Sequence, residues 1–237
     1  MERTARTRRR GSLRLSRSAA ALLAAAVLAC QSSSPGLEAH NRDRHGPPDV
    51  ERYIEMLERE ERVRYLQPDV VIEALRLPPD AIVADLGSGP GVFALRLARA
   101  CPTGVVYAVD VEPRQLDALR ARMTEEGIGN IVPVLASYDD PHLPPGRVDL
   151  ILISDTYHHI SDRVDYMRRL LRYLAPGGRL AILEFKPGDL PVGPPAHHKL
   201  PEGQRQKELQ EAGWERELRL DAHRYHEFEI WHRAPKP

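Results

Sequence analysis

Residues 81–91 read A-I-V-A-D-L-G-S-G-P-G, and this segment carries the clearest indication of the fold. Its start is apolar and contains β-branched Ile82 and Val83, the composition of a buried parallel strand. Asp85 ends the apolar run, and a glycine-rich turn leads into an apolar helical pattern over residues 92–100. A strand, a glycine turn and a helix in this order form one half of a doubly wound nucleotide-binding sheet.

A glycine turn alone also fits an ordinary connection between a strand and a helix. Two acids favour a ligand site. Asp85 comes two residues before the first glycine, where a carboxylate can face a cationic or hydroxylated ligand. Asp110 ends a second apolar run over residues 105–109, at the distance where dinucleotide-binding folds carry a ribose-binding acid. The dinucleotide pattern G-x-G-x-x-G itself fails, because Val92 occupies its third glycine position.

The pattern Asp-x-Gly-x-Gly-x-Gly, followed by an acid at the end of the next strand, resembles the class I S-adenosylmethionine-dependent methyltransferases. Residues 148–155, V-D-L-I-L-I-S-D, resemble the fourth strand of that family, and residues 174–180, L-A-P-G-G-R-L, resemble the turn into its fifth. The resemblance covers residues 69–231. It implies an α/β fold: a Rossmann-like doubly wound sheet of seven strands, the last antiparallel, with N-terminal cap helices.

The resemblance also implies S-adenosylmethionine as the cofactor. Asp110 would hold the two ribose hydroxyls, and Val111 would lie against the adenine. The loop after the third strand would contact adenine through Asp139, with Tyr138 and Ser137 as the alternatives. The residues expected to bind the cofactor are Asp85, Gly87, Ser88, Gly89, Gly91, Asp110, Val111, Asp139 and Asp155.

Residues 155–159 follow the fourth strand, and ligands of open α/β sheets bind beyond the carboxyl ends of strands. The candidates for catalysis are therefore Tyr157, His158 and His159, of which a histidine can act as a general base near neutral pH. A base is needed only when the acceptor must lose a proton. The alternative is that one histidine packs on the sheet, the other bonds the backbone, and Tyr157 forms a wall. Adjacent histidine pairs do not converge easily on one ion, so no metal site is expected.

The rest of the chain alternates between helical and strand patterns. Helices are expected over residues 49–66, as a cap or lid, 68–75, 114–126 and 202–212, and from a cap at Asp162 to residue 173. Strands are expected over residues 131–135, 149–154, 179–185, 218–220 and 225–231, and a long lid or binding loop over 186–199. Cys101 is expected to be a small buried apolar residue.

The formal net charge is zero, but residues 1–29 contain seven arginines and one acid. The remainder holds 27 basic and 33 acidic residues, a net charge of −6. A mildly acidic body lacks the electrostatic footprint of a nucleic-acid-binding protein. This balance disfavours RNA or DNA as a partner.

The first 29 residues are interpreted as a signal peptide, because arginines precede an eleven-residue apolar run over 19–29 that is too short to span a bilayer. Residues 27–30, V-L-A-C, resemble a bacterial lipoprotein processing box with Cys30 as the lipid-bearing residue. Residues 30–48 would be a flexible tether, 49–78 the cap helices and 79–237 the methyltransferase domain. The protein would then be exported, either periplasmic or anchored to a membrane through Cys30. If the leader is misread, it is cytoplasmic.

The sequence therefore predicts a methyltransferase that acts on a small-molecule or lipid-like acceptor, similar to bacterial enzymes of the ubiquinone-biosynthesis type. Two alternatives stay open: an NAD-binding oxidoreductase, and a non-catalytic S-adenosylmethionine-binding lipoprotein. The acceptor atom and the oligomeric state are not specified by any motif.

Overall fold

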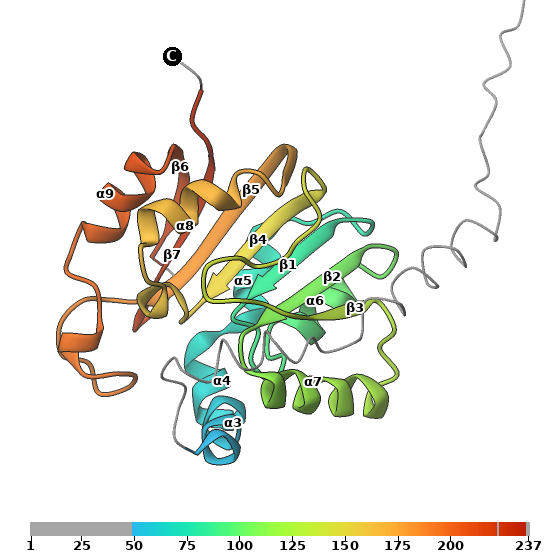
Figure 1. Ribbon diagram of the computed structural model, residues 1–237. Helices are drawn as coiled ribbons and strands as arrows, with labels where there is room; N and C mark the ends of the chain where they lie inside the picture. The colour runs from blue at the N-terminus through green and yellow to red at the C-terminus, as the bar shows by residue number, and fades with distance from the viewer. Residues whose placement is uncertain (1–48, 222, 236–237) are drawn as a thin grey trace, which may run out of the picture. The chain divides into compact units, whose positions relative to one another are not determined.

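The computed structural model describes residues 49–221 and 223–235, and within them the strands form one seven-stranded sheet (Figure 1). The strand order is β3-β2-β1-β4-β5-β7-β6. The strands are β1 (Ile82–Leu86), β2 (Val105–Asp110), β3 (Ile131–Leu135), β4 (Val148–Ser154), β5 (Leu174–Phe185), β6 (Trp214–Leu220) and β7 (His226–Arg233).

The sheet is parallel from β3 to β5, and β7 runs antiparallel to both of its neighbours, β5 and β6. The predicted fold, a doubly wound α/β sheet of seven strands with the last one antiparallel, is therefore confirmed. The strand order reverses between β1 and β4, which is the switch point where open α/β sheets bind ligands.

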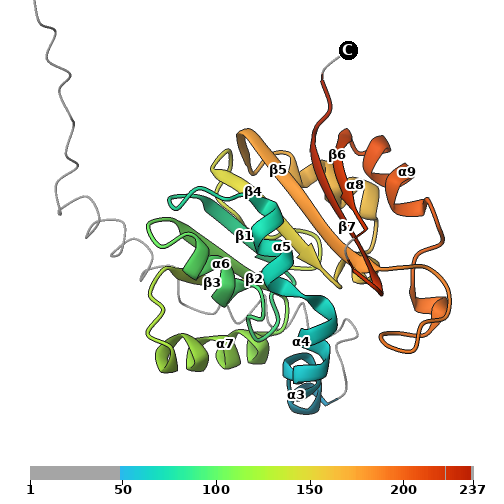
Figure 2. The same ribbon diagram turned by 180° about the vertical axis from the view of Figure 1, so that it is seen from behind.

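Helices cover both faces of the sheet. Figure 1 shows α8 over one face, and Figure 2 shows α5 and α6 over the opposite face. The helices are α3 (Val50–Glu58), α4 (Glu60–Leu66), α5 (Pro68–Leu75), α6 (Ala94–Ala100), α7 (Pro113–Glu125), α8 (Arg163–Leu170) and α9 (Gln204–Glu211), with short 3₁₀ turns η1 (Tyr157–His159) and η2 (Ala196–His198).

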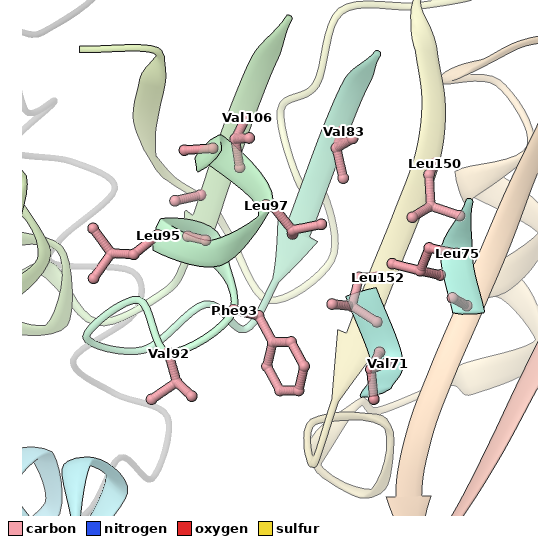
Figure 3. Close-up of a cluster of buried hydrophobic side chains, with 14 of the residues drawn as sticks. Val71, Leu75, Val83, Val92, Phe93, Leu95, Leu97, Val106, Leu150 and Leu152 are labelled. Carbon is pink, nitrogen blue, oxygen red and sulfur yellow. The ribbon is translucent and has the colours of Figure 1, made fainter. Parts of the chain in front are cut away.

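The core follows the two-residue period of the strands. Leu150 and Leu152 face the α5 and α6 side, where Leu75 and Leu97 pack with them (Figure 3). The intervening residues of β4 face the other side, in a second cluster that includes Met167 of α8. Because apolar side chains alternate between two buried faces, residues 150–153 of β4 form a continuous apolar run in the sequence.

Several boundaries differ from the sequence prediction for local reasons. The expected helix over 49–66 is broken at Arg59, which has an extended ψ of 132°. The strand expected from Arg179 begins at Leu174, because a bulge in the β4–β5 ladder lets Leu174 pair with Val148. Asp162 precedes α8, but its side chain makes no cap hydrogen bond to the helix.

The edge strand β6 begins four residues before the expected position at Leu218. Its outer residues are mostly exposed Glu and Arg, which conceal the strand in a hydrophobicity pattern. Charged side chains are a common protection of sheet edges against unwanted pairing.

Cys101 is buried, as the sequence predicted, and its thiol is free. Cys30, the signal peptide and the tether lie outside the described residues. Among the helices of residues 49–221 and 223–235, we find none whose length and apolarity would let it cross a bilayer.

Candidate functional site

A cavity of about 900 Å³ opens at the carboxyl ends of β1, β2 and β4. The glycine turn forms its floor, and the first two helices of the described chain contribute Tyr53, Leu57 and Arg62 to its wall. The position agrees with the general rule for ligand sites in doubly wound sheets. The cavity is large enough for a nucleoside-sized ligand together with a second small molecule.

The glycine turn owes its shape to backbone conformations and packing that a side chain would prevent. Gly87 has φ of +75°, and a Cβ atom there would lie 2.2 Å from the hydroxyl oxygen of Thr156. Gly91 has φ of +95°, and its Cβ would lie 2.4 Å from a methyl group of Leu119. The predicted role of these glycines in the tight turn is therefore supported by two independent steric constraints.

Asp110 ties the end of β2 to the glycine turn. Its Oδ2 accepts a hydrogen bond from the Gly89 amide at 2.8 Å, and its Oδ1 accepts one from the Glu112 amide at 2.9 Å. Burial raises the pKa of Asp110 in spite of these bonds, which act in the opposite direction. The side chain lines the cavity, so it can serve a ligand and hold the turn at the same time.

Asp85 is a deeply buried acid beside the cavity. It is 2% exposed, and its Oδ2 has no hydrogen-bond partner among the described residues. Burial raises the pKa of Asp85 to about 7, the Ala94 amide opposes that rise, and the negative charge of Asp110 adds to it. At neutral pH a carboxyl group with this pKa is partly protonated. A cationic ligand that binds beside it favours the ionised form, so the carboxyl group releases a proton on binding.

Three more buried polar atoms of the cavity lack partners in the described chain: Ser88 Oγ, Gln115 Oε1 and Ser154 Oγ. Together with Asp85, they account for four of the seven described residues with such atoms. Buried polar atoms normally have hydrogen-bond partners, so unpartnered atoms gathered in one cavity indicate a ligand site. The Asp85 and Gln115 oxygens could accept hydrogen bonds from a ligand, and the two serine hydroxyls could donate or accept them.

Gln115 and Ser154 were not singled out in the sequence. Gln115 lies four residues before Leu119 on the buried face of α7, a position where an apolar residue is ordinary. A side-chain amide on the apolar face of this helix was the one sequence feature that could have indicated a binding role for Gln115. Ser154 ends β4, and the carboxyl end of a strand next to the switch point was the corresponding signal there.

Arg62 connects the N-terminal helices to the sheet. Its Nη2 lies 2.9 Å from Oδ2 of Asp155, and its Nη1 donates to the Leu57 carbonyl at 3.3 Å, across the break between α3 and α4. Both side chains of the ion pair are largely buried. This contact holds the expected cap over the cavity, and the sequence prediction did not include Arg62.

Asp155 is therefore engaged on both oxygens. The second oxygen, Oδ1, lies 3.0 Å from Nε2 of the fully buried His226. Asp155 lines the cavity with φ of +48°, an uncommon conformation for a residue other than glycine. Its predicted role in binding the cofactor stays a prediction, and the structure gives it a further role in fixing Arg62.

Two residues were predicted to contact the adenine, and one of them lies in the cavity while the other lies outside it. Val111 lines the cavity beside Asp110. The Asp139 side chain is 69% exposed and is not part of the lining, which in this loop consists of Ala136, Ser137 and Tyr138. The loop contacts the cavity as expected, but through residues before Asp139.

The three catalytic candidates have different surroundings. Tyr157 is fully buried and donates its hydroxyl to Glu208 Oε2 at 2.9 Å, so burial and that carboxylate raise the pKa of Tyr157. His158 Nδ1 lies 2.9 Å from Oε1 of Glu184. Of the three residues, His159 is the one that lines the cavity. No group of three His, Cys, Asp or Glu side chains in residues 49–221 and 223–235 is placed to hold a metal ion.

Comparison with known proteins shows a likeness to methyltransferases. Residues 83–178 match the family model described as "Methyltransferase domain". The matched stretch includes the glycine turn and Asp110, which border the cavity.

Two solved structures share the fold. One is a SAM-dependent methyltransferase from Aquifex aeolicus, with a TM-score of 0.73 and 24% identity, covering 77% of this chain and 97% of that one. The other is phosphoethanolamine N-methyltransferase 2 of Haemonchus contortus in complex with S-adenosyl-L-methionine, with a TM-score of 0.55 and 19% identity, covering 64% of this chain and 38% of that one.

Relatives by sequence include the ubiquinone/menaquinone biosynthesis C-methyltransferase UbiE of Ectopseudomonas mendocina, 33% identical over 121 residues. That alignment covers 50% of this chain and 47% of the relative. The enzyme of the same name from Vibrio vulnificus is 33% identical over 109 residues, which cover 45% of this chain and 42% of the relative. The chain thus spans a little under half the length of these curated relatives.

Proposed function

We propose that this chain is an S-adenosylmethionine-dependent methyltransferase that transfers a methyl group to a small-molecule or lipid-like acceptor. The observation that carries the proposal is the set of unpartnered buried polar atoms in one cavity, on Asp85, Ser88, Gln115 and Ser154. The methyltransferase domain match over residues 83–178 supports the same function.

These residues fit the chemistry of S-adenosylmethionine. The cofactor carries a sulfonium, an ammonium and two ribose hydroxyls, and all of these suit carboxylate, amide and hydroxyl oxygens as partners. Among the described residues, neither Asp85 nor Asp110 has a cationic side chain bonded to it. A cation is the partner that would lower the cost of their burial.

The charge balance of the cavity disfavours the NAD-linked alternative. Its two lining arginines are each paired with a carboxylate, Arg62 with Asp155 and Arg114 with Glu112. The pyrophosphate of NAD would therefore lie near the carboxyl groups of Asp85 and Asp110. Among the described lining residues, it would find no arginine that is not already paired with a carboxylate. The replacement of the third dinucleotide-motif glycine by Val92 agrees with this conclusion.

S-adenosylmethionine, when bound, supplies a methyl group on a positively charged sulfur as the electrophile. The residues of this chain would bring the two reactants together and exclude water, which are large contributions in such reactions. Tyr53 and Leu57 would cover the cavity, and Asp85 would hold a cationic group. His159 faces the cavity and would take the proton of an acceptor that must lose one.

The test is binding to the full chain, followed by a search for product. In equilibrium dialysis we expect saturable binding of labelled S-adenosylmethionine and no binding of labelled NAD at the same concentration. Asp110→Ala should lose affinity, whereas Asp117→Ala, a control on an α7 side chain that is 70% exposed, should retain it. Binding of NAD instead would refute the proposal.

Mass spectrometry of envelope extracts incubated with the enzyme and isotopically labelled cofactor would identify the acceptor. Transfer of the label to a small or lipid-like compound is expected. Tight binding of the cofactor with no labelled product in any extract would favour the non-catalytic alternative.

We also propose that residues 1–29 direct export and that Cys30 carries a lipid anchor. The proposal is supported by the arginine-rich start, the short apolar run over 19–29 and the V-L-A-C box at 27–30. Metabolic labelling with a fatty acid should mark the wild-type chain but not Cys30→Ala. An unlabelled, unprocessed chain in the cytosolic fraction would refute export.

A further inference from the structure

A buried carboxylate, that of Glu184, contacts the first of the two adjacent histidines of η1. Glu184, near the end of β5, is 2% exposed, and its Oε1 lies 2.9 Å from Nδ1 of His158. Its Oε2 also accepts from the His158 amide at 3.3 Å. One carboxylate thus fixes both the backbone and the ring of His158, although Glu184 does not line the cavity.

The two imidazoles are adjacent but face different surroundings. The ring centroids of His158 and His159 are 4.0 Å apart, with 43° between the planes. Two positive charges at about 4 Å repel by roughly 1 kcal/mol in water and about 4 kcal/mol at a protein surface. The pair therefore resists holding two protons, and the carboxylate bonded to His158 selects the ring that is charged.

We propose, on the basis of the proposed function, that Glu184 and His158 are positioning residues that keep the single positive charge on His158 and leave the cavity-facing His159 neutral as the proton acceptor. The His159 nitrogen would take the proton of the acceptor group as the acceptor atom forms its bond to the methyl carbon. The bond from that carbon to the sulfonium sulfur would break at the same time, with its electron pair left on sulfur and the demethylated cofactor leaving as a neutral thioether. The electron pair of the broken bond to hydrogen stays on the acceptor atom, and the proton leaves for solvent from the exposed His159.

The electrostatic surroundings agree with this division. Burial would lower the pKa of His158, but the hydrogen bond and charge of Glu184, helped by Asp155, outweigh burial and the opposing charge of Arg163, and raise it. The pKa of His159 is lowered, first by partial desolvation of its ring by neighbouring groups and then by His158 and His198, against the opposing charges of Glu184 and Asp155.

The test is a titration of the histidine rings by NMR in the full chain labelled at the histidine Cε1 carbons. The His159→Asn variant identifies the His159 signal among the ten histidines. In His158→Gln, His159 faces Glu184 without the intervening charge, and its midpoint should rise by about one pH unit. Adding Glu184→Gln to that variant should cancel the rise.

An unchanged or lowered His159 midpoint in His158→Gln overturns the proposal. Should that variant not fold, Glu184→Gln decides: the His158 midpoint should fall, and a wild-type midpoint overturns the proposal. A merely structural role of Glu184 would not move either titration.

Kinetics provide the second measurement. The acid limb of kcat against pH should move upward in His158→Gln by the same amount as the His159 midpoint, while the affinity for S-adenosylmethionine stays constant. A shifted midpoint with an unshifted acid limb would overturn the role of His159. Absence of transfer in wild-type protein would instead refute the proposed function, and the NMR titration would still decide the charge assignment.

Discussion

Ligand binding at Asp85 should release a proton near neutral pH. Its carboxyl group is buried, with Oδ2 unpartnered in the described chain and a pKa of about 7 before a ligand arrives. A cationic ligand beside it would restore an ordinary carboxylate pKa. At pH 7, about half a proton should therefore leave the protein per ligand bound, and about 0.9 at pH 6.

The same linkage sets the pH dependence of affinity. The ionised fraction of a group with a pKa of about 7 rises from about one tenth at pH 6 to about nine tenths at pH 8. If binding requires the ionised form, the dissociation constant should fall about tenfold over this range, which is about 1.4 kcal/mol. An ammonium of the ligand that titrates in the same range would take up protons on binding, so it cannot imitate the release.

Isothermal calorimetry of S-adenosylmethionine binding at pH 6, 7 and 8, in two buffers of different ionisation enthalpy, measures the proton count directly. Asp85→Asn is the matched variant, because its amide oxygen can still accept from the Ala94 amide. The variant should lose the proton release and the Asp85 part of the pH dependence. Equal proton counts in the wild type and the variant would show that Asp85 does not release the proton.

The remaining predictions concern stability and the cavity wall. Asp85→Asn should raise the free energy of unfolding at pH 8 by up to about 4 kcal/mol. The pKa of Asp85 is higher in the folded chain than in the unfolded chain, so the wild type loses stability as pH rises from 4 to 7. Denaturant titrations with equal wild-type and variant profiles would contradict this. Gly87→Ala should lower the free energy of unfolding by about 3 kcal/mol, because residue 87 has a positive φ and its new Cβ would clash with Thr156. In urea titrations, adding Thr156→Gly to that variant should recover part of the loss. Full wild-type stability of the single variant would be inconsistent with the turn described. Arg62→Met should speed cofactor dissociation about tenfold in stopped flow by opening the cap, and an unchanged rate would remove Arg62 from the closure of the cavity. Asp110→Ala should weaken cofactor binding at least about tenfold while the circular dichroism stays native, whereas loss of the native spectrum would mean that its bonds to the turn dominate.

The sheet and the floor of the cavity could be predicted from the sequence because they depend on local patterns. Strands β1 to β4 are short apolar runs with clear ends, and the glycine turn and Asp110 stand at fixed distances from them. The edge strand β6 was harder, since its exposed charges follow the need to protect an edge and not the period of a buried face.

The contacts that support the cavity could not be predicted, because they join distant parts of the chain. Arg62 meets Asp155 across 93 positions, and Glu184 reaches His158 across 26. Neither contact leaves a periodic signal in one sequence. The burial of Gln115 was hidden for a different reason, since a polar side chain in an amphipathic helix is ordinarily assigned to the solvent face.

We propose that the cavity at the ends of β1, β2 and β4 holds the sulfonium nucleoside, which a crystal structure of the full chain with S-adenosylmethionine or its demethylated product would test. We expect the ligand inside this cavity, with its polar groups within hydrogen-bond distance of Asp85, Ser88, Gln115 and Ser154. A ligand bound elsewhere, or a cavity whose orphaned atoms bond only water in the saturated crystal, would contradict it.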